Sequence, residues 1–135
     1  MAKKLAMILG IVFVIVGVLG FIENPIVGEY GYFMTNAVHN LAHLLIGIIM
    51  LVMASKGEAS AAMSMTIFGV VYLLLAVLGF VMSSPLLGLV EYNAADNWLH
   101  VVLGVVLLVL GMTNKGSAPA MPSSGMGGSG MGGMN

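Results

Sequence analysis

The 135-residue chain is 60% hydrophobic and 7% charged, with a mean hydropathy of +1.11 and a formal net charge of −1. A soluble domain carries about 25% charged residues, so this chain has too few charges to cover a surface that faces water. The charge balance provides no basic patch for nucleic acid, and a sequence without cysteine excludes disulfides and thiolate metal sites. The composition predicts one small domain that is surrounded by lipid.

Four stretches have the length of a membrane-spanning helix, which needs about 20 mostly apolar residues. In chain order they are residues 5–22, 34–54, 61–82 and 93–112. After His43 and His100 the cleanly apolar runs contain only eleven and twelve residues. At about 1.5 Å per residue neither run crosses about 30 Å of hydrocarbon, so the second and fourth helices must begin earlier. The polar residues that precede both runs are therefore drawn into the outer layer of the membrane.

The lysines predict the orientation of these helices. All of them fall in the N-terminus, the second loop and the C-terminal segment, which share one side of the membrane after four crossings: Lys3, Lys4, Lys56 and Lys115. The acidic residues other than Glu58 fall on the opposite side: Glu23, Glu29, Glu91 and Asp96. Because lysine is enriched in cytoplasmic loops, we expect both termini in the cytoplasm and a multi-pass protein of a bacterial or archaeal plasma membrane.

The chain also contains an internal repeat. The matching pairs are residues 8–21 with 67–80, 25–28 with 85–88, and 35–47 with 92–104. The first pair has seven identities in fourteen positions. We therefore predict an all-α integral membrane protein of four transmembrane helices over 1–113, built as two parallel helical-hairpin repeats, about 5–54 and 61–112. Such repeats are related by a pseudo-twofold axis along the membrane normal.

Each hairpin carries a polar motif at the start of its second helix. Asparagine, asparagine, histidine and glycine recur at i, i+4, i+7 and i+11, which places them on one helix face. His39 and Asp96 occupy equivalent positions beside this stripe. If the second and fourth helices meet at the axis, His43 faces His100, Asn40 faces Asn97, and His39 can form a hydrogen-bonded pair with Asp96. The predicted interhelical polar cluster is Asn36, His39, Asn40, His43, Asn93, Asp96, Asn97 and His100.

Small residues recur at a spacing of seven along the helices. Glycine lets membrane helices approach closely and gain packing contacts, so we interpret these positions as packing sites. The predicted helix-packing glycines are Gly10, Gly17, Gly47, Gly69, Gly104 and Gly111.

The two motifs read NxxHNxxHxxxG from Asn36 to Gly47 and NxxDNxLHxxxG from Asn93 to Gly104. Together with the VLGF endings of the first and third helices, they resemble the bacterial and archaeal four-helix membrane family carried as domain of unknown function 4383. The resemblance covers about residues 5–113. It implies the four-helix fold and a polar cluster, and it implies no activity.

Residues 114–135 form a segment of different composition, in which glycine, serine and proline dominate. Such a segment buries too little apolar area to order itself, so we predict a flexible cytoplasmic tail that docks on a partner. An alternative interpretation is that the thioether groups of its methionines bind Cu(I): Met121, Met126, Met131 and Met134.

The sequence contains no catalytic constellation, so we do not expect an enzyme or a resident cofactor. The first interpretation is an accessory or structural subunit, or an assembly factor, that packs in the bilayer against other membrane-protein subunits or against itself. One alternative is a binding protein in which His43 and His100 ligate haem or a chlorophyll-type pigment, or in which a metal is held by His39, His43, Asp96 and His100. A second alternative is a small transporter or proton conductor, because ionisable groups inside a membrane often mark a pathway.

Overall fold

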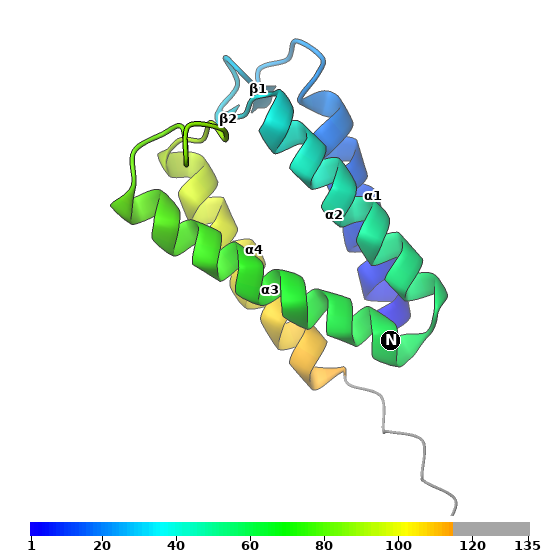
Figure 1. Ribbon diagram of the computed structural model, residues 1–135. Helices are drawn as coiled ribbons and strands as arrows, with labels where there is room; N and C mark the ends of the chain where they lie inside the picture. The colour runs from blue at the N-terminus through cyan, green and yellow to red at the C-terminus, as the bar shows by residue number, and fades with distance from the viewer. Residues whose placement is uncertain (115–135) are drawn as a thin grey trace, which may run out of the picture.

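The computed structural model of the protein describes residues 1–114, which form four α-helices and one short two-stranded sheet (Figure 1). The elements are α1 (Ala2–Leu19), β1 (Val27–Gly28), β2 (Phe33–Met34), α2 (Ala37–Ser55), α3 (Glu58–Val81) and α4 (Ala94–Thr113). The mean hydropathy of the helices ranges from 1.8 to 2.3, and each is long and apolar enough to span a membrane. This confirms the prediction of four such helices, and these are the helices of a small multi-pass membrane protein.

The first helix lies about one turn earlier than the predicted stretch 5–22, and residues 20–36, which include β1 and β2, connect it to α2. The Asn24 side chain explains where α1 ends. Its amide group donates to the carbonyls of Leu19, Ile22 and Val27, while its carbonyl accepts the backbone N–H groups of Ile26 and Val27. These bonds satisfy backbone groups that a helix end leaves open, so the chain turns although Phe21 and Ile22 are apolar.

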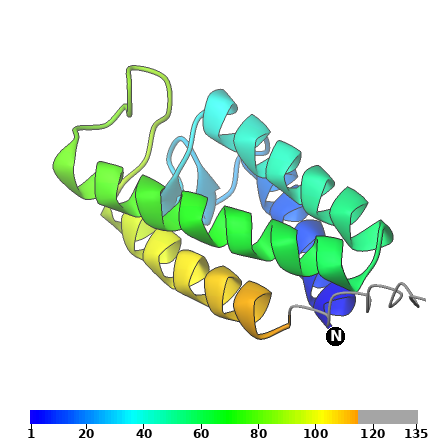
Figure 2. The ribbon, with the colours of Figure 1, turned by 60° about the horizontal axis from the view of Figure 1, so that its bottom comes forward.

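The helices pack as two antiparallel hairpins, α1 with α2 and α3 with α4 (Figures 1 and 2). The six glycines predicted for packing all lie where the partner helix of the same hairpin approaches. A Cβ atom on Gly47 would lie 2.7 Å from the Gly10 carbonyl oxygen, and one on Gly104 would lie 2.7 Å from Leu73 Cγ. No larger side chain fits at these positions without moving the helices apart, so glycine sets the close approach within each hairpin.

The contact between the hairpins is made by α3, which packs against both α1 and α2 (Figure 2). We expected the second and fourth helices to meet along an axis, but instead they approach each other mainly through side chains near their N-terminal ends. Ala61 and Ala62 at the start of α3 are fully buried, and the Ala62 carbonyl lies against Gly111 of α4. At the same end, the Met1 amine donates to Glu58 Oε2 at 2.8 Å, so α1 and α3 begin side by side.

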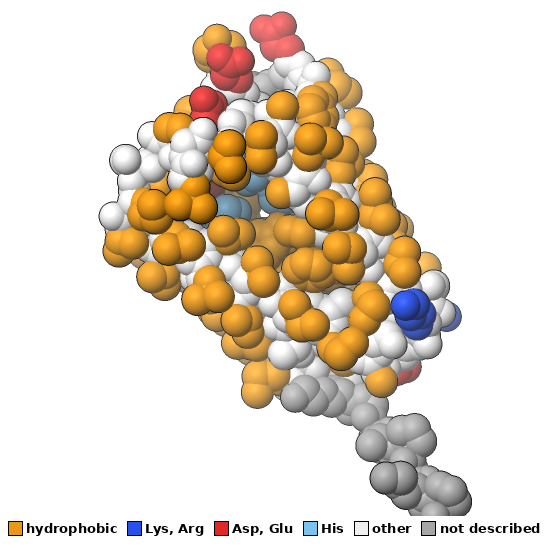
Figure 3. All heavy atoms as spheres, viewed as in Figure 1, with side chains coloured by type: hydrophobic (Ala, Val, Ile, Leu, Met, Phe, Trp, Pro, Cys, Tyr) orange, Lys and Arg blue, Asp and Glu red, His pale blue; other side chains and the backbone are white. Residues whose placement is uncertain are grey.

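Side chains of different chemistry separate along the molecule. Hydrophobic side chains cover its sides, acidic side chains gather at one end and lysines lie near the other end (Figure 3). At the acidic end, β1 and β2 form a parallel pair in which Val27 aligns with Phe33. This end of the molecule, where α2 and α4 begin, carries the polar motifs.

Candidate functional site

Two equivalent asparagines begin α2 and α4 and hold together the loops that precede these helices. Asn36 Oδ1 accepts the His39 N–H at 3.0 Å, and Asn93 Oδ1 accepts the Asp96 N–H at 3.1 Å. Both are helix N-caps, and the Asp96 carboxylate completes a capping box by accepting the Asn93 N–H at 2.9 Å. The amide group of each asparagine also crosses to the other hairpin, from Asn36 to the Leu89 carbonyl and from Asn93 to the Tyr32 carbonyl.

The second pair of asparagines packs within each hairpin rather than between them. The Asn97 amide donates to the Gly79 carbonyl at 2.8 Å, and a Cβ atom on Gly79 would overlap the Asn97 side chain. A Cβ atom on Gly20 would overlap the Asn40 side chain in the same way. The expectation that Asn40 faces Asn97 is therefore not met, because each amide fills the space left by a glycine near the end of its own partner helix.

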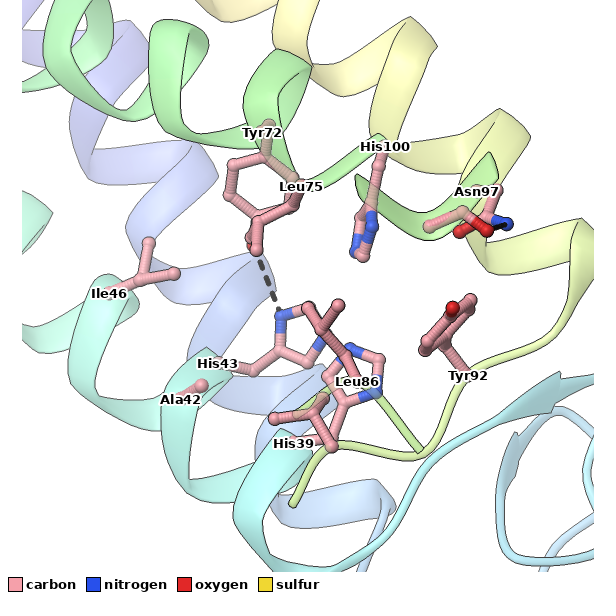
Figure 4. Close-up of a pocket in the computed structure, with 12 residues that line it drawn as sticks. His39, Ala42, His43, Ile46, Tyr72, Leu75, Leu86, Tyr92, Asn97 and His100 are labelled. Carbon is pink, nitrogen blue, oxygen red and sulfur yellow. Dashed lines mark hydrogen bonds between the residues drawn. The ribbon is translucent and has the colours of Figure 1, made fainter. Parts of the chain in front are cut away.

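The three histidines, in contrast, converge from both hairpins (Figure 4). His39 and His43 come from α2 and His100 comes from α4, and one ring nitrogen from each lies within 4.8 Å of the other two. The side chains are buried, with exposed fractions of 4%, 8% and 7%. The rings of His39 and His43 stack with centroids 4.8 Å apart, and the His39 and His100 centroids lie 5.9 Å apart.

Two of the imidazoles are oriented by hydrogen bonds through Nδ1. His39 Nδ1 lies 2.7 Å from the Glu91 backbone carbonyl. Because a carbonyl oxygen only accepts, Nδ1 of His39 donates this bond, and in the neutral tautomer with that proton Nε2 is the nitrogen left to bind a metal. His43 Nδ1 lies 3.3 Å from the Tyr72 hydroxyl, so the same arrangement is open to His43 (Figure 4).

Aromatic residues from the first helix of each hairpin hold His43 in place, and the sequence analysis did not single them out. Tyr72 on α3 is 1% exposed, and Phe13 on α1 stacks against both Tyr72 and His43 with centroid distances of 5.4 and 5.8 Å. Tyr72 also meets the His100 ring edge-on at 5.1 Å. The internal repeat could have identified this aromatic pair, because Phe13 and Tyr72 occupy equivalent positions of the aligned segments 8–21 and 67–80.

Asp96 lies apart from the histidine nitrogens. Its carboxylate accepts the Asn93 N–H, and it does not belong to the group of ligand atoms within 4.8 Å. Within residues 1–114 no hydrogen bond joins Asp96 to His39, which bonds to the Glu91 carbonyl instead. Of the four residues predicted as candidate metal ligands, only the three histidines therefore lie in one group.

Two cavities adjoin the histidines, and both are lined by His43 and His100. The first, called here the front hollow, has a volume of about 120 Å³ and lies between α2, α3 and α4. The histidines are visible at the bottom of this hollow, framed by hydrophobic side chains (Figure 3). The second cavity, of about 270 Å³, lies between α1 and α4 and includes Asp96 and Thr35.

This arrangement brings one nitrogen from each of three imidazoles to one buried place. Zinc is bound by histidine at about 2.0–2.1 Å in tetrahedral geometry, with ligand atoms about 3.4 Å apart. The three nitrogens lie within 4.8 Å of one another, so the imidazoles would have to move closer together to bind one ion. A fourth coordination position would then face the front hollow.

The model of the family described as domain of unknown function (DUF4383) matches residues 3–113. The chain therefore belongs to this family, which confirms the resemblance predicted from the paired motifs. Comparison with curated proteins gives no match, and neither does comparison with solved structures.

Proposed function

We propose that this DUF4383 member is a small membrane protein that binds one divalent transition-metal ion, of the zinc class, through His39, His43 and His100. The observation that carries the proposal is the convergence of three buried ring nitrogens within 4.8 Å. Ionisable side chains inside a membrane are costly unless they are paired or used, so three adjacent imidazoles indicate a ligand.

The main alternative is that the histidines only hold helices together. The asparagines already supply adhesion, through two cross-loop bonds between the hairpins and through the contacts of Asn40 and Asn97 with glycine within each hairpin. Within residues 1–114 no hydrogen bond links any two of the histidines, and the His100 ring has no hydrogen-bond partner. His39 and His43 do bond across the helices, to the Glu91 carbonyl and the Tyr72 hydroxyl, but adhesion of helices does not by itself require three ring nitrogens to converge.

The cavity volumes and the donor set both favour a single metal ion over haem or a pigment. Volumes of about 120 and 270 Å³ lie below the about 300–1,000 Å³ of pockets that enclose drug-sized ligands, and a macrocycle is larger still. Three imidazoles without thiolate or thioether donors suit zinc and its neighbours better than Cu(I). The proposed Cu(I)-binding methionines of the tail lie outside the described residues.

We further propose that the protein is a non-enzymatic accessory subunit with both termini in the cytoplasm, and that its halves are parallel repeats. The equivalent contacts of Asn40 with Gly20 and of Asn97 with Gly79 support the repeat. The separation of lysines from acidic side chains supports the orientation. Purification in mild detergent tests the accessory role: we expect a discrete complex with other membrane proteins or a homo-oligomer, and migration as a lone monomer under every mild condition argues against it.

Binding of Co(II), a spectroscopic substitute for zinc, tests the metal site directly. We expect the purified, chelator-treated protein to take up one equivalent and to show the visible absorption of four-coordinate Co(II). His43→Ala and His100→Ala should each weaken binding by at least about a hundredfold, because a ligand is lost from the inner sphere.

Ser64→Ala is the matched control, since it removes a buried hydroxyl of α3 that bonds only to the Ala61 carbonyl, eight residues before Tyr72. Co(II) should bind to this variant as to the unaltered protein. Absorption that persists after both histidines are replaced would place the metal elsewhere and refute the proposed function.

A further inference from the structure

We propose that the front hollow binds the carboxylate head group of a single-chain lipid, a free fatty acid, which supplies the fourth metal ligand. This inference rests on the proposed function, because the carboxylate is recognised by the metal ion. It adds the chemical class of the second ligand and the route by which that ligand arrives.

The charge of the site calls for an anion. Three neutral imidazoles leave a divalent ion with its full charge of +2, and isolated charge in a medium of low dielectric constant is strongly unfavourable. Within residues 1–114 no aspartate or glutamate side chain lines the front hollow. Asp96 lines the other cavity and is committed to the Asn93 N–H, and Glu91 offers only its backbone carbonyl to His39. Among residues 1–114, the front hollow therefore offers the ion no carboxylate, so an anion that binds on this side of the ion comes from elsewhere.

The volume of the hollow selects a head group rather than a whole ligand. Its volume of about 120 Å³ lies below the about 300–1,000 Å³ of pockets that enclose drug-sized ligands. A carboxylate fits in this space, whereas the hydrocarbon chain attached to it must remain outside. A two-chain phospholipid with its bulky phosphodiester head does not fit.

The rim of the hollow determines which anion can enter. The side chains around it are apolar: Ala42, Ile46, Leu75, Leu86 and Val90. The hollow opens between hydrophobic side chains on the flank of the helices (Figure 3), where hydrocarbon surrounds a membrane protein. A water-soluble anion would have to pass through this apolar rim, while a fatty acid already lies in the bilayer with its chain along the helices. The histidines lie in the first two turns of α2 and α4, at the end of the molecule that carries the polar motifs.

The experiment uses the full-length protein, delipidated in detergent and loaded with Co(II), and adds oleate. We expect oleate to change the visible Co(II) spectrum at one equivalent and to remain bound in native mass spectrometry. Methyl oleate and oleyl alcohol, which have the chain without the carboxylate, and acetate, which has the carboxylate without the chain, should each bind at least about tenfold more weakly.

A pair of tryptophan variants locates the lipid. Ala42 is exposed at the rim, so Ala42→Trp should close the hollow and weaken oleate binding by about tenfold or more, while Co(II) still binds to the histidines. Leu45→Trp is the control, because Leu45 is 59% exposed on the same helix and does not line the hollow. Its oleate affinity should equal that of the unaltered protein.

The possible outcomes separate the two proposals. A histidine-dependent Co(II) spectrum that oleate does not change overturns the lipid inference and leaves the metal site standing. Acetate that binds as tightly as oleate, or oleate that binds equally to Ala42→Trp, also overturns the inference, because the chain or the hollow is then irrelevant. Absence of any histidine-dependent Co(II) spectrum refutes the proposed function itself.

Discussion

Tyr72 and Tyr92 are buried tyrosines that line the same hollow, but their hydroxyl groups have different partners. Tyr92 donates to the Met82 carbonyl at 2.7 Å and closes the outer loop of the second hairpin. Tyr72 lies 3.3 Å from His43 Nδ1 and so influences which nitrogen of that ring carries the proton. At the residue scale, Tyr72 is therefore a positioning residue for the proposed metal ligand.

The tyrosine pair gives a test of this role. Tyr72→Phe should lower the Co(II) affinity by about tenfold, because the loss of partners that orient metal ligands typically costs ten- to a hundredfold. Tyr92→Phe should leave the affinity unchanged and lower only the stability of the fold. Metal titrations followed by visible absorption measure both. Equal affinities in the two variants would show that the Tyr72 hydroxyl does not orient His43.

At the scale of the element, the N-cap asparagines combine two tasks that substitution can separate. Asn93 caps α4 and also bonds to the Tyr32 carbonyl of the other hairpin. Asn93→Ala should lower the free energy of unfolding by about 2 kcal/mol, from about 1 kcal/mol for the cap and about 1 kcal/mol for the cross-loop bond. Asn93→Ser keeps a capping oxygen on a shorter side chain, so we expect about half that loss in SDS unfolding titrations. If serine is as damaging as alanine, the cross-loop bond rather than the cap dominates.

The glycines opposite the buried amides make a second prediction about elements. Gly79→Ala should destabilise the second hairpin by about 1–3 kcal/mol, because the new Cβ would overlap the Asn97 side chain. Adding Asn97→Ala makes room for that methyl group. The double variant should therefore lose less stability than the sum of the two single variants, as measured by the same unfolding titrations. Strict additivity would mean that the amide and the glycine do not contact each other.

Some features of the helices were predictable from the sequence, and others were not. Hydropathy predicts all four helices, because a spanning helix must be apolar over most of its length. The end of α1 was misplaced, since Phe21 and Ile22 extend the apolar run and only the bonds made by Asn24 end the helix. That α3 makes the contact between the hairpins was not predictable, because a helix that is apolar all round has no single face that identifies its neighbour.

The polar motif was predicted in position and only partly in arrangement. Helical spacing places the asparagines and histidines on one stripe, and the histidines do converge from both hairpins. The residues of the stripe do not all face one another, because a residue at the start of a helix caps the helix. Asn36 and Asn93 are such N-caps. Asn40 and Asn97 turn toward Gly20 and Gly79, which is a pairing that spacing within one helix cannot reveal.

At the scale of the whole molecule, the two ends differ in charge and the histidine site lies near only one of them. Tyr30, in the outer loop between β1 and β2, is 87% exposed at the acidic end. Ala59 is exposed at the opposite end, in the first turn of α3 beside Glu58. If the lysine-rich end is cytoplasmic, the rim of the hollow belongs to the outer half of the bilayer, so the proposed lipid would enter from the outer leaflet.

The absence of cysteine from the sequence makes this orientation directly measurable. Tyr30→Cys and Ala59→Cys each introduce a single thiol at an exposed position and leave every lysine and acidic residue in place, so the charge pattern that directs insertion is unchanged. We expect a membrane-impermeant maleimide to label Tyr30→Cys on intact cells and to label Ala59→Cys only after the membrane is permeabilised. The reversed result would place the histidine site near the cytoplasmic face, and a fatty acid would then have to arrive from the inner leaflet.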